Sequence, residues 1–217
     1  MTDETTDAAP VLEAEPAVAV TLFGDRIEVA RSFTNRLARR GEELGLIGPL
    51  ELPRLWTRHI LNSALLAPLL EAGASVGDVG SGAGLPGLVL AIARPDVSMT
   101  LIEPMERRCE WLRNEADRLG LENVTVVRAR AEVVADDLVL DQVTARAVSA
   151  LSKLIPLTVP LVRSGGQLIL MKGARVDDEV AAARKVILRK RLDDVEVLEL
   201  GVGVVEETTR VFRATVD

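Results

Sequence analysis

A glycine-rich segment that follows a short apolar stretch most strongly limits the folds open to this chain. It reads Asp78-Val79-Gly80-Ser81-Gly82-Ala83-Gly84-Leu85-Pro86-Gly87. Glycine adopts φ > 0 and lets a ligand approach the backbone where a Cβ would collide. A strand that runs into such a turn and then into a helix is typical of α/β proteins that present backbone amides to an adenosine-containing cofactor. Glu103 follows the next predicted strand, where an acid can accept hydrogen bonds from ribose hydroxyls.

The sequence around this segment alternates apolar runs with helical patterns. We expect strands at 75–79, 98–102, 124–128, 142–147 and 167–172, and helices at 86–93, 106–119, 151–161 and 177–191. This alternation predicts an α/β fold in which helices cover both faces of a mostly parallel sheet. Residues 195–200 and 209–216 read as two more strands with no helix between them, so we expect a C-terminal antiparallel strand pair.

Composition divides the chain into three predicted parts. Residues 1–18 hold five acids and two prolines, which indicates a disordered acidic tail. Residues 19–73 form an N-terminal helical segment, and residues 74–217 form the cofactor-binding domain. Of the net charge of −7, five negative charges lie in the tail, which leaves −2 for the rest of the chain. With aromatic residues at 2%, the basic footprint and the base-stacking surface of a general RNA-binding module are both missing.

The chain has one cysteine and one histidine, which restricts its chemistry. A single cysteine excludes an internal disulfide and fits the reducing cytoplasm. No apolar run reaches the roughly 20 residues of a membrane span, and no cluster of metal ligands is visible in the sequence. We therefore expect a cytoplasmic protein with neither a membrane partner nor a metal.

The glycine pattern Gly82-Ala83-Gly84-Leu85-Pro86-Gly87 alone leaves the cofactor open, because nicotinamide and flavin enzymes share it. Asp78 favours a different ligand, since a carboxylate repels a pyrophosphate but attracts the cationic amino-acid end of S-adenosylmethionine. Arg130-Ala131-Glu132 follows the third predicted strand, where a polar pair can border an adenine. S-adenosylmethionine is therefore the favoured ligand, and a tight turn without a ligand is the alternative.

Residue types and motifs that the sequence lacks limit which kind of atom can accept the methyl group. Cys109, the only thiol, lies in the predicted helix 106–119, so a cytosine C5 methyltransferase nucleophile is missing and a buried structural cysteine is favoured. The turn after the fourth strand reads Thr144-Ala145-Arg146-Ala147-Val148, without the Asn/Asp-Pro-Pro-aromatic turn of exocyclic-amine methylation. The remaining acceptor class already holds a free lone pair, such as a ring nitrogen. Such an acceptor needs alignment and exclusion of water, but no base.

Several polar side chains are candidates for ligand contacts. Arg146 ends the fourth predicted strand and Lys172 the fifth, so both are possible catalytic residues. Arg146 could hold the cofactor carboxylate or orient the acceptor, and Lys172 could meet a phosphate. A surface ion pair and a solvated lysine are the alternatives. His59 could approach the cleft or pack between helices. The further RNA-contact candidates, which could instead be solvated helix faces, are Arg36, Arg39, Arg40 and Arg58.

The ending Leu85-Pro86-Gly87 makes the motif more specific than a bare glycine run. From Asp78 to Gly87 the sequence resembles the cofactor motif of the glucose-inhibited division protein B family, the bacterial small-subunit ribosomal RNA (guanine-N7) methyltransferases G. The likeness covers about residues 20–217. It includes Arg94-Pro95, Arg107-Arg108, Trp111-Leu112, Leu121-Glu122-Asn123-Val124, Arg130-Ala131-Glu132, Arg146-Ala147, Lys172-Gly173, His59 and Ser63. Asn62 departs from the aspartate that the family usually has.

The resemblance implies a class I, Rossmann-like methyltransferase behind an N-terminal helical segment. It implies S-adenosylmethionine as methyl donor and N7 of one guanine in small-subunit ribosomal RNA as acceptor, with that RNA or the small ribosomal subunit as partner. The cofactor contacts that it implies are Gly80, Leu85, Ala131, Glu132 and Arg146. The chemistry of the residues adds Asp78, Gly82, Gly84 and Glu103. The alternatives are methylation of another acceptor and a non-catalytic, S-adenosylmethionine-binding ribosome assembly factor.

Overall fold

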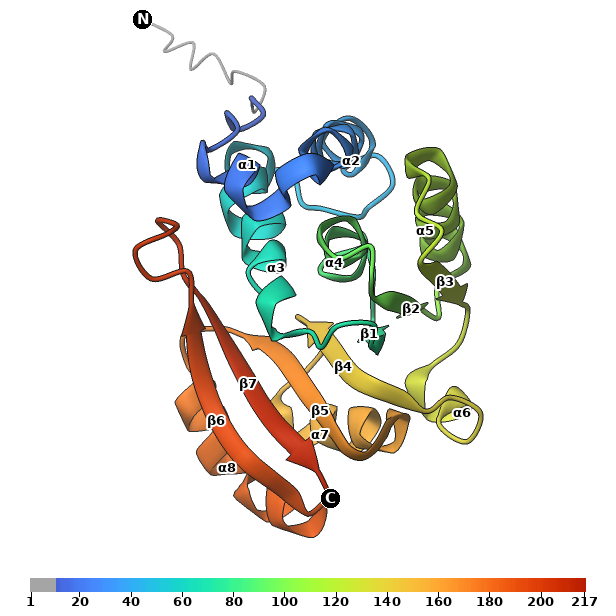
Figure 1. The fold of residues 1–217 in the computed structure, drawn as a ribbon, viewed down its shortest axis with the longest axis vertical. Helices are drawn as coiled ribbons and strands as arrows, with labels where there is room; N and C mark the ends of the chain where they lie inside the picture. Colours follow the sequence, from blue (N-terminus) through green and yellow to red (C-terminus); the bar gives the residue numbers. More distant parts are fainter. Residues whose placement is uncertain (1–10) are drawn as a thin grey trace, which may run out of the picture.

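A seven-stranded sheet forms the centre of the computed structural model, which describes residues 11–217. Its strand order is β3-β2-β1-β4-β5-β7-β6 (Figure 1). The strands are β1 (Ser75–Val79), β2 (Ser98–Ile102), β3 (Val124–Val127), β4 (Leu140–Arg146), β5 (Val162–Lys172), β6 (Leu192–Leu200) and β7 (Thr209–Val216). Strands β1 to β5 are parallel, and β7 pairs antiparallel with both β5 and β6. The predicted mostly parallel sheet and its C-terminal antiparallel pair are confirmed.

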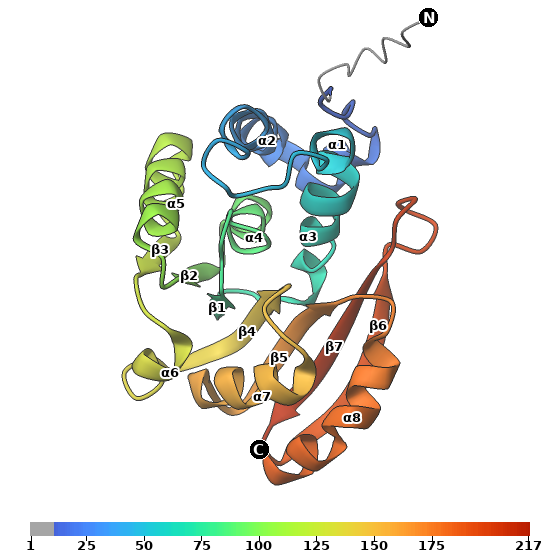
Figure 2. The same ribbon diagram turned by 180° about the vertical axis from the view of Figure 1, so that it is seen from behind.

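Helices cover both faces of the sheet (Figures 1 and 2). One face carries α1 (Val18–Phe23), α2 (Ile27–Arg40), α3 (Asn62–Ala64), α4 (Gly87–Ala93) and α5 (Glu106–Leu119). The other carries α6 (Ala131–Val134), α7 (Leu151–Thr158) and α8 (Val176–Arg189). Short helical turns are η1 (Gly24–Arg26), η2 (Leu52–Arg54), η3 (Leu55–Leu61), η4 (Ala67–Leu69) and η5 (Val159–Leu161). Within the described residues, no helix combines the length and apolar character needed to cross a membrane.

Helix α4 shows why the N-terminal helices belong to the same core as the sheet. Its residues from Leu88 to Ile92 are all fully buried, and a helix that is apolar on every side must be enclosed on every side. Strand β2 contacts α4 from one direction. Phe33 and Leu37 of α2 belong to the same buried cluster. The boundary at residue 73 stays a prediction, but the two parts share one hydrophobic core.

Residues 11–17 of the predicted disordered tail make specific contacts with the rest of the chain. Residues 1–10 of that tail lie outside the described part of the chain. The Glu15 carboxylate pairs with the Arg31 guanidinium through contacts of 2.6 and 2.7 Å. Glu13 accepts a hydrogen bond from the Thr57 backbone N–H at 3.0 Å, near the start of η3. The prediction of disorder was wrong here because these acids satisfy a specific guanidinium and an otherwise unpaired helix-start amide.

Within the predicted N-terminal helical segment, residues 55–70 do not form one continuous helix. Residues 55–61 form the π-helical turn η3, which passes into α3, and η4 follows with Pro68 near its start. The apolar residues at helical spacing are nevertheless buried: Trp56, Ile60, Leu61, Leu65 and Leu66. Wider π-helical turns are frequent at functional sites, and η3 carries His59.

Candidate active site

The carboxyl ends of the parallel strands bring most of the predicted cofactor residues to one edge of the sheet. Ala131 and Glu132 follow β3, Glu103 follows β2, the glycine loop follows β1, and Arg146 ends β4. From β1 the chain winds outward to β2 and β3, and it then returns to place β4 on the other side of β1. Open α/β sheets bind ligands at such a switch point. The spatial order of these residues therefore fits a single ligand crevice.

The conformation of the loop after β1 depends on glycine. Its backbone has positive φ angles of 74°, 54° and 92° at Gly80, Gly82 and Gly84, a region that L side chains rarely adopt. A Cβ on Gly84 would lie 2.5 Å from the Leu88 side chain. The glycines therefore fix both the turn and the close approach of α4 to the loop.

Two buried carboxylates accept hydrogen bonds from backbone amides in and beside this loop. Glu103 accepts hydrogen bonds from the backbone N–H of Gly82 at 3.0 Å and of Met105 at 2.9 Å, one on each oxygen. Asp78 is fully buried, and its Oδ2 accepts from Gly87 N–H at 3.0 Å. Its Oδ1 has no hydrogen-bond partner within the described residues. Burial raises the pKa of Asp78 to about 7, although the hydrogen bond from the Gly87 N–H opposes the shift.

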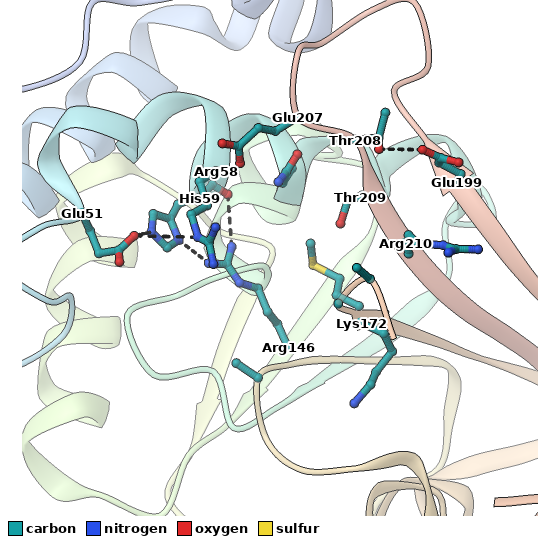
Figure 3. Close-up of a pocket in the computed structure, with 15 residues that line it drawn as sticks. Glu51, Arg58, His59, Arg146, Lys172, Glu199, Glu207, Thr208, Thr209 and Arg210 are labelled. Carbon is teal, nitrogen blue, oxygen red and sulfur yellow. Dashed lines mark hydrogen bonds and ion pairs between the residues drawn. The ribbon is translucent and has the colours of Figure 1, made fainter. Parts of the chain in front are cut away.

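Arg146 and His59 meet at the end of β4 (Figure 3). The Arg146 Nη2 hydrogen-bonds to His59 Nδ1, and Arg146 Nη1 lies 3.5 Å from both the His59 carbonyl oxygen and Ser63 Oγ. His59 Nε2 lies 2.6 Å from a carboxylate oxygen of Glu51. A chain of contacts therefore runs from Glu51 of the N-terminal segment, through the only histidine, to the end of β4.

The charges of Glu51, His59 and Arg146 depend on burial and on their neighbours. His59 is 8% exposed, and burial together with the nearby Arg146 cation lowers its pKa to about 4. Burial and the charge of Arg58 lower the pKa of Arg146 to about 10. Burial raises the pKa of Glu51, but hydrogen bonds from Arg54 and His59 outweigh it and lower that pKa overall. At neutral pH the imidazole is therefore neutral, and it lies between a carboxylate and a guanidinium cation.

A cavity of about 770 Å³ opens beside Arg146. Its lining comes from η3, the ends of β4 and β5, and the hairpin of β6 and β7. Predicted residues that line it are Arg58, His59, Arg146 and Lys172. The predicted Arg36, Arg39 and Arg40 lie on α2 and do not line it. Arg36 instead lies 3.5 Å from Glu115 of α5, and Arg40 lies 2.8 Å from Glu43.

Two of the lining cations have acidic or carbonyl partners. Lys172 Nζ donates to the Ser149 carbonyl oxygen at 2.8 Å and pairs with Glu179 at 2.8 Å. Its side chain points away from Arg146 (Figure 3). Arg210, which Lys172 faces across the β5–β7 register, pairs with Asp177 at 3.0 Å. Arg58 is about half exposed, and its closest carboxylate, that of Glu51, is 4.0 Å away. Arg58 and Arg146 are therefore the cations that the cavity can offer to a ligand.

Sequence reasoning did not select several polar residues that also line the cavity, of which Glu51, Glu207 and Thr208 lie in loops. The polar residues that it did not select are Glu51, Asn62, Glu199, Glu207, Thr208, Thr209 and Arg210. Only Arg210 had a usable signal, because the predicted antiparallel pair had to dock one strand on the sheet, and β7 docks on β5. Cys109 is buried, as the sequence favoured, and its thiol donates to the Glu103 carbonyl oxygen at 3.0 Å.

This chain is similar to known proteins along most of its length. The family model described as rRNA small subunit methyltransferase G matches residues 26–206. A relative named Ribosomal RNA small subunit methyltransferase G, from Clavibacter michiganensis subsp. michiganensis, is 66% identical over 206 residues and covers 95% of this chain and 97% of its own length.

Two solved structures share the fold of this chain. A precorrin-6y C5,15-methyltransferase from Geobacter metallireducens GS-15 has a TM-score of 0.53 at 17% identity, covering 79% of this chain and 91% of its own. A SAM-dependent O-methyltransferase from Thermotoga maritima has a TM-score of 0.54 at 18% identity, and the match covers 72% of this chain and 65% of its own. These two structures confirm the class I methyltransferase sheet. The relative from Clavibacter michiganensis is far more similar in sequence than either of them. The chain belongs to the rRNA small subunit methyltransferase G family.

Proposed function

We propose that this protein transfers a methyl group from S-adenosylmethionine to N7 of one guanine in 16S ribosomal RNA. Family membership gives the reaction class and the type of RNA. One structural observation carries the proposal further. Both ring nitrogens of the only histidine already have protein partners, Glu51 and Arg146. A guanine N7 carries a free lone pair and needs no such base, whereas an exocyclic amine or a hydroxyl must lose a proton.

The residues at the strand ends fit S-adenosylmethionine. When bound, this cofactor supplies an electrophilic methyl group on a sulfonium ion. Gly80, Gly82, Gly84 and Leu85 would border it with bare backbone, and Ala131 and Glu132 would border its adenine. Each oxygen of Glu103 accepts only one bond from the described residues and keeps a lone pair for a ribose hydroxyl. The unpartnered Oδ1 of Asp78 suits a cationic amino-acid end.

Arg146 would serve either the cofactor or the guanine base. It ends β4, beside the glycine loop, and it also lines the cavity. Its cation would hold the cofactor carboxylate or orient the electron-rich edge of the base. The main work of the chain would then be to align the acceptor lone pair with the methyl group and to exclude water.

RNA would approach over the cavity. Arg58 is the exposed cation of its rim and the first candidate for a phosphate contact. Lys172 is a weaker candidate because its ammonium already pairs with Glu179. Arg36, Arg39 and Arg40 would contribute only if the RNA also covers α2. A substrate within the small ribosomal subunit would place the enzyme in the cytoplasm.

Transfer of tritium from labelled S-adenosylmethionine to small-subunit RNA tests the function. The RNA comes from a strain that lacks the enzyme, both free and assembled into subunits. We expect one labelled guanine at which borohydride and aniline then cleave the chain. Label at another atom, with no cleavage, would refute the N7 assignment. Transfer of label to a molecule other than ribosomal RNA would favour another acceptor. Tight cofactor binding without any transfer would favour an assembly factor.

A further inference from the structure

The contacts of His59 determine which of its nitrogens carries the hydrogen. A guanidinium has donors and no acceptor, so the His59 Nδ1 that contacts Arg146 Nη2 must be the unprotonated nitrogen. The hydrogen then sits on Nε2, which donates to the Glu51 carboxylate at 2.6 Å. This is the arrangement by which a carboxylate fixes the tautomer of a histidine in other buried sites.

The neutral ring leaves the charge of Arg146 uncompensated. The described residues place no carboxylate within 4.0 Å of the Arg146 guanidinium, whose partners are the imidazole, the His59 carbonyl oxygen and Ser63 Oγ. A carboxylate at the position of His59 would orient the arginine equally well, but it would also neutralise it. An imidazole acceptor orients the guanidinium and keeps its positive charge for a ligand.

We propose that Glu51 and His59 form a positioning pair for Arg146. Glu51 fixes the ring as the Nε2–H tautomer, and the Nδ1 lone pair of His59 then fixes the guanidinium at the end of β4. His59 is thus a positioning residue that transfers no proton. The effect on methyl transfer rests on the proposed function, because Arg146 must hold a ligand of that reaction. The geometry of the pair itself does not.

Two amide substitutions separate the roles of the two ring nitrogens. His59→Asn can place its amide oxygen near the position of Nδ1 and keep an acceptor for Arg146. His59→Gln reaches the position of Nε2, keeps a contact with Glu51 and removes that acceptor. We expect kcat/KM for RNA methylation to fall less than about 10-fold in His59→Asn and about 100-fold in His59→Gln, because the hydrogen bond that orients the Arg146 guanidinium is lost only in the second.

The two variants should unfold at similar temperatures, which separates positioning from packing. Arg189→Ala, an exposed change on α8 outside the cavity lining, is the control for purification and assay. Equal losses in both His59 variants would fit a proton-transfer role or a general packing role and would overturn the proposal. Full activity in both, or a more active His59→Gln, would also overturn it.

Nitrogen-15 NMR tests the pair without RNA or cofactor. The chain contains one histidine, so the imidazole gives a single set of signals. We expect a neutral Nε2–H tautomer at pH 7, a rise of the His59 pKa in Arg146→Ala and a fall in Glu51→Gln. An imidazolium or an Nδ1–H tautomer at pH 7 would overturn the proposal even if methylation is confirmed. The expected spectra without any RNA methylation would instead refute the proposed function.

Discussion

The two sides of the candidate active site, the glycine loop and the cavity beside Arg146, carry opposite charges. On the glycine-loop side, the buried carboxylates of Asp78 and Glu103 accept hydrogen bonds from backbone amides of the loop and its surroundings. On the cavity side, the cation of Arg146 is held by a neutral ring and a carbonyl oxygen. An acidic protein of net charge −7 therefore keeps a local positive charge by orienting one arginine with groups that do not neutralise it.

The two sides also differ in how the chain assembles them. The glycine-loop side comes from β1, β2 and the turns that directly follow them. The cavity side joins residues 51–62 with 146–147, 171–174 and 199–210. We therefore expect a substitution that disturbs the buried groups of the first side to act mainly on folding, and one on the second side to act mainly on catalysis.

The largest effect should come from Gly87→Val on the glycine-loop side. A Cβ at this position would collide with the Leu101 side chain and lie 2.6 Å from the Asp78 Oδ2 that accepts the Gly87 N–H. Overpacking and the loss of that buried bond together should cost on the order of 5 kcal/mol of unfolding free energy. Urea unfolding measures it, with Gly173→Val as control, because a Cβ there meets nothing within 4 Å. Equal stability of the two variants would contradict the prediction.

The buried carboxyl of Asp78 should make stability depend on pH. Burial raises its pKa from 3.8 to about 7 in the folded protein. Below pH 4 the group is protonated in both states, and above pH 7 it is ionised in both, at a cost to the folded state. Stability should therefore fall by roughly 4 kcal/mol between pH 4 and pH 7 through this group.

The isosteric Asp78→Asn variant removes this titration. Its stability relative to the wild type should rise across the same pH interval, as measured by urea unfolding at each pH without cofactor. Saturating S-adenosylmethionine should reduce the slope if its cationic end meets the Oδ1 of Asp78. A difference between wild type and variant that does not change with pH would exclude a titrating Asp78.

The glycine-loop side is also the side that local sequence predicts well. Strands β1 and β2 and helix α5 begin and end where the apolar pattern predicts. Glu103 lies beside the glycine loop, as its position after the second predicted strand implies. These features depend on neighbours within one strand–turn–helix unit, so spacing and glycine content are sufficient to predict them.

The cavity side shows where such prediction ends. No local pattern connects Glu51 to His59 and Arg146, because their contact depends on how η3 packs against the end of β4. The acids Glu13 and Glu15 resemble a solvated tail in composition, yet their partners lie on η3 and α2. Lys172 ends its strand as predicted, but Glu179 of α8 already pairs with its ammonium. Tertiary partners, which a single sequence does not list, decide these cases.

Arg146→Ala should break the cavity side while leaving the fold intact. We expect RNA methylation to fall about 100-fold or more, since an oriented charge is lost from the reacting centre. The unfolding temperature should change little, because no carboxylate within the described residues loses a partner. Arg146→Lys should not rescue activity, as an ammonium cannot reproduce the planar contacts. Turnover like that of the wild type in Arg146→Ala would refute the role.

Arg58→Ala should have the smallest effect and should concern only the approach of RNA. Its guanidinium is about half exposed and lies 4.0 Å from the closest carboxylate, so its removal should scarcely change stability. If it contacts one phosphate, KM for RNA should rise about threefold near 0.15 M salt while kcat stays within twofold. The slope of log KM against log salt should then fall by roughly 0.7 to 0.9. Because Arg189→Ala removes an equal charge outside the cavity, an equal rise in KM there would assign the effect to net charge and exclude the contact.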